Sequence, residues 1–79
     1  MTVRRDPDGR IVLDGVCSVE DAEPLCQLLQ ATPEAACDWT RCSSLHTAVA
    51  QVLMAARSPL AGPCGDPWIE MWVAPQLSR

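Results

Sequence analysis

Thiol, imidazole and hydroxyl groups that could do chemistry gather in one stretch of the chain, residues 37–47. Cys37, Cys42 and His46 follow a C-x4-C-x3-H spacing, and Cys64 is a further thiol. Such groups bind zinc, or act as a nucleophile when a base activates the thiol. Zinc thiolates are usually closer in sequence, as in C-x2-C, and no acid that would orient His46 is evident. We therefore expect no cofactor, no metal and no enzyme. A small metal- or thiol-dependent enzyme using Cys37, Cys42 and His46 is the alternative.

The hydroxyl of Thr47 lies at the predicted start of an apolar helix. Free N–H groups and the helix dipole favour negative charge there, so a phosphate could be added or bound. The alternative role for Thr47 is to cap the helix. A core does not need the polar residues of the loop predicted over residues 41–48, so we expect that loop to bind a partner. Besides Thr47, its polar residues are Arg41, Ser43, Ser44 and His46.

The first half of the chain predicts a hairpin followed by a helix. Residues 2–4 pair with a strand at 10–13 across an Asp-Pro-Asp-Gly turn, and Asp14-Gly15 ends that strand. A helix begins between Ser18 and Glu20, with an apolar face repeating at helical spacing, and Thr32-Pro33 ends it.

The second half predicts two more strands and two helices. A buried strand covers residues 35–39, and a helix over 46–57 is apolar nearly all round. Residues 58–62 form a short edge strand because Pro59 limits pairing. Asp66-Pro67 then begins a last helix, which Pro75 ends. Residues 68–73 also alternate between apolar and polar, so a strand is the competing prediction there.

This order of elements predicts one α/β domain over residues 1–79. Parallel strands need crossover helices, so we expect a mixed sheet of about four short strands covered by about three helices. Residues 1–9 are either flexible or an edge strand. With no Phe or Tyr in the chain, Trp68 and Trp72 could anchor a partner or cover the small core. We expect the covering role for one of the two.

Composition excludes several classes of protein. The net charge is −4, there is no lysine, and the six arginines are scattered, which argues against binding nucleic acid or an anionic membrane. No apolar run approaches the roughly 18 residues of a membrane span, and no signal segment follows Arg4-Arg5, so we expect a cytoplasmic protein. The chain has five cysteines, an odd number, whereas a disulfide scaffold usually has an even number. We therefore expect the cysteines to be small buried residues with free thiols in a reducing compartment. The chain has a thin core, so a homo-oligomer is plausible.

Taken in order, residues 10–77 resemble a STAS domain, the sulfate transporter and anti-sigma factor antagonist family. Asp38 is similar to that family's strand-closing acid, and residues 46–49 occupy its helix-opening Asp-Ser/Thr-Ser/Ala-Gly motif. His46 and Val49 stand where the family has Asp and Gly, while Thr47 matches the hydroxyl residue.

The resemblance implies a regulatory protein-binding module. In anti-sigma factor antagonists a partner kinase phosphorylates the motif hydroxyl and so breaks the complex. In a related branch the domain is an accessory subunit bound to the ATPase of a transporter. The expected partner is therefore a kinase-like anti-sigma factor or a transport ATPase subunit, and Thr47 is the expected phosphoacceptor.

Overall fold

The computed structural model describes residues 2–77 and has an α/β architecture built on a four-stranded mixed sheet. The spatial order of the strands is β1-β2-β3-β4; β1 is antiparallel to β2, and the other neighbours are parallel. This confirms the predicted fold class, including the hairpin at the N-terminus. The strands are β1 (Val3–Arg5), β2 (Ile11–Cys17), β3 (Cys37–Leu45) and β4 (Leu60–Ala61).

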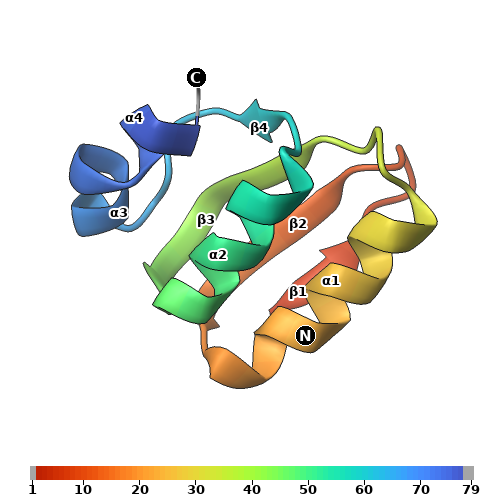
Figure 1. Cartoon of the computed structure of the whole chain (residues 1–79), viewed down its shortest axis with the longest axis horizontal. Helices are drawn as coiled ribbons and strands as arrows, with labels where there is room; N and C mark the ends of the chain where they lie inside the picture. The colour runs from red at the N-terminus through yellow and green to blue at the C-terminus, as the bar shows by residue number, and fades with distance from the viewer. Residues whose placement is uncertain (1, 78–79) are drawn as a thin grey trace.

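Helices cover one face of this sheet (Figure 1). The two longest, α1 (Ala22–Ala31) and α2 (Thr47–Ala56), lie side by side across it, and a 3-10 turn, η1 (Val19–Asp21), precedes α1. Two short helices, α3 (Pro67–Trp72) and α4 (Ala74–Leu77), occupy the place of the predicted last helix. Among residues 2–77, no helix combines the length and the apolar character that crossing a bilayer requires.

The core fills the space between the sheet and the helices. Trp39 is its largest member, and its indole N–H donates to the carbonyl of Gly62 at 2.8 Å, which satisfies the one polar atom of the side chain. This single buried tryptophan supplies the aromatic bulk that the missing Phe and Tyr would otherwise give. The buried residues around it include Ile11, Leu13, Cys17, Leu25, Leu29, Cys37, Cys42, Leu45, Val49, Leu53 and Ile69.

Both central strands are longer than their sequences predicted. β2 continues through Asp14 and Gly15 to Cys17, and β3 continues past Trp39 to Leu45. The pairing of β2 with β3 shifts register twice, once between Val12 and Asp14 and once just after Gly15. Each shift gives β3 an extra residue, which disrupts the alternation that marks a strand. The predicted ends at Gly15 and Trp39 were therefore wrong.

The helix boundaries follow local capping chemistry with one exception. Asp21 accepts a hydrogen bond from the backbone N–H of Ser18 at 2.8 Å, and Pro24 lies in the first turn of α1, where its missing N–H costs little. At the C-terminus the prediction that Pro75 ends the last helix was wrong. The break comes earlier, at Val73, and Pro75 lies within α4.

Candidate functional site

The structure brings most of the predicted partner-binding residues to one edge of the sheet. Ser43 and Ser44 are exposed near the end of β3, and His46 and Thr47 are exposed where α2 begins. The loop predicted for residues 41–48 is thus mostly strand, because the register shifts hide its pairing in the sequence. Arg41 is also exposed but lies farther back along β3, opposite Asp14. We use "carboxyl edge" for the exposed residues Val16, Ser43, Ser44, His46, Thr47 and Trp68.

His46, not Thr47, caps α2. Its Nδ1 accepts a hydrogen bond from the backbone N–H of Ala48 at 3.0 Å, so Nδ1 carries no proton and the ring N–H is Nε2. The backbone N–H of His46 also donates to the carbonyl of Cys17 at 2.9 Å, which ties the start of α2 to the end of β2. The exposed hydroxyl of Thr47 therefore has no capping role.

Asp66 joins α3 to the same edge. One carboxylate oxygen accepts from the backbone N–H groups of Trp68 at 3.0 Å and Ile69 at 3.4 Å, as an N-cap does. The other accepts from the backbone N–H of Leu45 at 2.9 Å. One side chain thus holds the end of β3 and the start of α3 together, and the backbone of Trp68 lies near the end of β3.

Large apolar side chains are exposed on α3. Trp68, Met71 and Trp72 are 57%, 66% and 60% exposed, and their i, i+3, i+4 spacing puts them on one side of the helix, the "apolar face of α3". Ile69 is buried on the other side. The expectation that Trp68 or Trp72 covers the core was wrong, because Trp39 and Ile69 fill that space. On β2, Val16 is 62% exposed.

The alternative thiol or metal site is not assembled. The thiol of Cys37 donates to the hydroxyl of Ser58 at 3.5 Å, whereas Cys42 lies five residues further along β3 with its sulfur 3.8 Å from that of Cys17. At a rise of about 3.3 Å per residue, the two positions are roughly 16 Å apart. Both thiols are buried and His46 is exposed. Among the residues that the structure describes, no three His, Cys, Asp or Glu side chains form a metal site.

Asp38 does not close a strand, contrary to the prediction from the resemblance. It is the second residue of β3, at the opposite end of the strand from Thr47, because β3 begins at Cys37. Its carboxylate accepts from the hydroxyl of Thr40 at 2.7 Å and from the backbone N–H of Thr40 at 3.0 Å, and Arg10 is 3.9 Å away. The two bonds from Thr40 are the main reason that the pKa of Asp38 is lowered.

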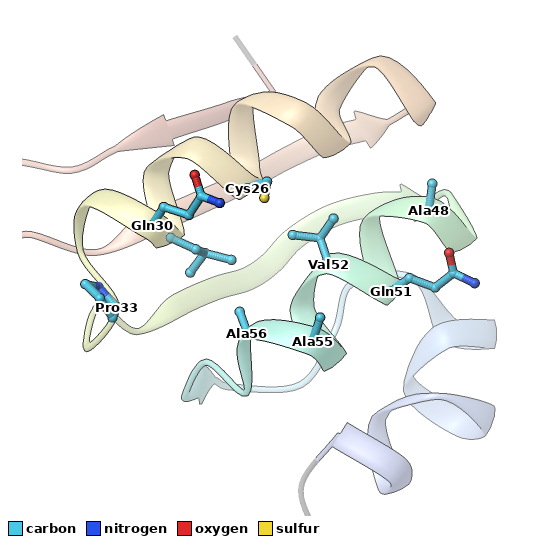
Figure 2. Close-up of a pocket in the computed structure, with 9 residues that line it drawn as sticks. Cys26, Gln30, Pro33, Ala48, Gln51, Val52, Ala55 and Ala56 are labelled. Atoms are coloured by element: carbon cyan, nitrogen blue, oxygen red, sulfur yellow. The ribbon is translucent and has the colours of Figure 1, made fainter.

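A groove between α1 and α2 was not predicted (Figure 2). Its volume is about 520 Å³, and no charged residue lines it. Alanine side chains on α2 leave this space open, and the amides of Gln30 and Gln51 lie at its sides (Figure 2). The one feature of the sequence that could have indicated this groove is that α2 contains no charged residue. The lining residues are Cys26, Leu29, Gln30, Pro33, Ala48, Gln51, Val52, Ala55 and Ala56.

Comparison of the chain with protein-family models, with curated proteins and with solved structures found no match. The resemblance to STAS domains therefore depends on the residues quoted above.

Proposed function

We propose that this protein is a non-catalytic interaction module that binds a protein partner through the apolar face of α3 and the adjoining carboxyl edge. The observation that carries the proposal is the exposure of Trp68, Met71 and Trp72 on one side of a six-residue helix. Contiguous exposed apolar groups mark interaction surfaces, and tryptophan is prominent among residues that dominate binding energy.

The way α3 is held supports this function. Ile69 is buried beneath the helix and Asp66 caps its first turn, so the helix is anchored on one side and at one end. A partner that buries the two tryptophans would gain large contact area from side chains with only two rotatable bonds each, at a low cost in conformational entropy. Polar groups of the carboxyl edge would form the rim of such an interface.

The partner class that we propose follows the STAS resemblance. A kinase-like anti-sigma factor would use Thr47 as its phosphoacceptor, and a transport ATPase subunit would use the same surface for permanent assembly, in either case in the cytoplasm. A second copy of this chain is the remaining alternative. Thr47 suits the first partner because its hydroxyl is exposed at a helix N-terminus and has no capping role.

The proposal is tested by capturing partners from the native host with tagged protein. We expect the Trp68→Ala/Trp72→Ala double variant to lose at least about tenfold of a captured partner, because buried tryptophans at interfaces contribute about 2 kcal/mol or more each. Met54→Ala is the matched control, since Met54 is an exposed apolar residue on α2. Equal capture by the wild type and the double variant would contradict the proposal.

The switch is tested separately with Thr47. Mass spectrometry of protein from the host should show phosphate on Thr47, and Thr47→Glu should weaken capture while the neutral Thr47→Gln, of similar size, should not. Unmodified Thr47 together with unchanged capture by Thr47→Glu would rule out the phosphoacceptor role and leave the interaction module in place.

A further inference from the structure

Two buried thiols touch beneath the carboxyl edge. Cys17 is the last residue of β2 and Cys42 lies in the neighbouring strand β3, and their sulfur atoms are 3.8 Å apart. Both side chains are almost completely buried, at 1% and 0% exposure. The two residues are 25 positions apart in the chain, so the contact is made by the folded sheet and not by local sequence.

The contact lies at an irregular point in the pairing of the two strands. Cys42 is paired with Gly15, and Cys17 with Leu45, so the two cysteines lie diagonally across the second register shift. Gly15 has no side chain to fill the space beside Cys42, and its φ of +77° suits glycine.

The two thiols are electrostatically different. The sulfur of Cys42 has two possible acceptors for its proton, the sulfur of Cys17 at 3.8 Å and the carbonyl of Ser44 at 3.2 Å. The hydrogen bond from Cys42 lowers the pKa of Cys17, against opposing effects of burial and of Asp21. The same bond, with burial, raises the pKa of Cys42. Cys17 is therefore the better nucleophile, because the thiolate is the reactive form.

We propose that Cys17 and Cys42 are a redox-active pair that hydrogen peroxide converts to an intramolecular disulfide. The Cys17 thiolate attacks one peroxide oxygen, the O–O bond breaks, and a sulfenic acid forms; the leaving hydroxide takes up the proton that the Cys17 thiol lost and becomes one water. The Cys42 sulfur then attacks the sulfenic sulfur, its proton leaves with the hydroxyl as a second water, and the S–S bond forms. Two thiols are oxidised by two electrons, and one peroxide is reduced to two waters.

The remaining thiols are in different surroundings. Cys37 donates to Ser58, and burial raises its pKa. Burial also raises the pKa of Cys64 to about 11, so this thiol stays protonated at neutral pH. Cys26 is partly exposed on the groove between α1 and α2. Because Cys17 is buried, the proposed reaction requires local opening at the end of β2, where the next residue, Ser18, is exposed.

Disulfide formation would change the carboxyl edge. A sulfur–sulfur bond is about 2.05 Å long, so the two atoms must approach by nearly 2 Å from their present 3.8 Å. Cys17 carries the carbonyl that holds the N–H of His46, and Cys42 is next to Ser43 in β3. Oxidation therefore draws together the ends of the two strands that position the start of α2.

The test is peroxide treatment of the folded wild-type protein, followed by alkylation of thiols under denaturing conditions and peptide mapping. We expect two of the five thiols to be lost, a Cys17–Cys42 cross-linked peptide, and return of both thiols with dithiothreitol. Cys37→Ser should behave as the wild type, whereas Cys17→Ser and Cys42→Ser should form no such cross-link. Full alkylation of Cys17 and Cys42 after treatment, or a cross-link to Cys64 instead, would overturn the proposal, and the wild-type map decides this even if a variant fails to fold.

Discussion

The two ends of β3 have different chemistry. At the amino end, Cys37 donates to Ser58, and Ser58 in turn donates to the carbonyl of Ala35 at 3.0 Å. At the carboxyl end, Cys42 faces a second thiol, and the serines that follow it are exposed, with Ser44 paired with Val16. The amino end uses its polar groups to stabilise the fold. The carboxyl end has apolar side chains at its surface and two touching thiols buried beneath it, and both the proposed function and the proposed redox pair are placed there.

The largest expected effect comes from Gly65, where the chain passes against the second half of β3. A β-carbon at this position would lie 2.4 Å from the carbonyl oxygen of Cys42 and 2.7 Å from that of Thr40, both backbone atoms. We expect Gly65→Ala to cost about 3 kcal/mol or more of unfolding free energy, because a rigid strand must move to relieve the clash.

Urea denaturation measures that cost, and Gly9→Ala is the control. Gly9 has a φ of +93° but no atom within 4 Å of its added β-carbon, so only backbone strain of about 1–2 kcal/mol is expected. Equal losses for the two variants would show that the close approach of Gly65 to β3 is unimportant.

The next effect tests the joint between β3 and α3. Asp66→Ala removes the cap of α3 and the acceptor for the N–H of Leu45, so we expect a loss of about 2 kcal/mol. His46→Ala removes one capping bond of α2 and should cost about 1 kcal/mol. Thermal unfolding of both variants makes the comparison, and a larger loss for His46→Ala would show that Asp66 does not hold the carboxyl edge together.

A smaller effect is expected from two serines, Ser58 beside the amino end of β3 and Ser43 near its carboxyl end. Ser58→Ala leaves the carbonyl of Ala35 and the thiol of Cys37 without their partner in a buried place, so we expect a loss of about 1 kcal/mol. Ser43→Ala, at the exposed end, should change stability by less than about 0.5 kcal/mol. Guanidinium unfolding of the two variants measures both losses. A larger loss of unfolding free energy for Ser43→Ala than for Ser58→Ala would contradict the difference between the two ends.

The smallest expected effect is a pH dependence from Asp38 at the amino end. Its pKa is lowered in the folded state, chiefly by Thr40, so its charged form adds stability above the ordinary value of 3.8 and this is lost as the pH falls through the lowered value. Solvent screening keeps the contribution under about 1 kcal/mol. Asp38→Asn should be less stable than the wild type at pH 6, and this difference should shrink towards pH 2. A constant difference across that range, measured by urea unfolding, would assign the effect to lost packing.

Local chemistry made the order of elements predictable from the sequence. Asp66 followed by Pro67 gives a helix start through a capping carboxylate and a fixed φ, and α3 begins there. The start of α2 was correctly placed near Thr47, because an apolar helical pattern follows that residue. The short edge strand after Pro59 was also correct, since proline limits pairing on one side.

Features that depend on distant residues were not predictable. The second half of β3 reads as a polar loop because the two register shifts abolish the period of two, and Asp38 was therefore placed at the wrong end of the strand. His46 was considered as a metal ligand or base, and its capping bond depends on side-chain geometry that sequence does not show. The contact of Cys17 with Cys42 requires the strand pairing itself.

The shortness of β4 has a consequence for how the molecule behaves when crowded. This edge strand is only Leu60–Ala61, with Pro59 before it and Pro63 soon after, and proline has no N–H to offer a neighbouring chain. A second molecule that tried to extend the sheet here would find too few backbone groups to pair with. The β4 edge of the sheet is thereby protected against the strand-by-strand growth that leads to fibrils.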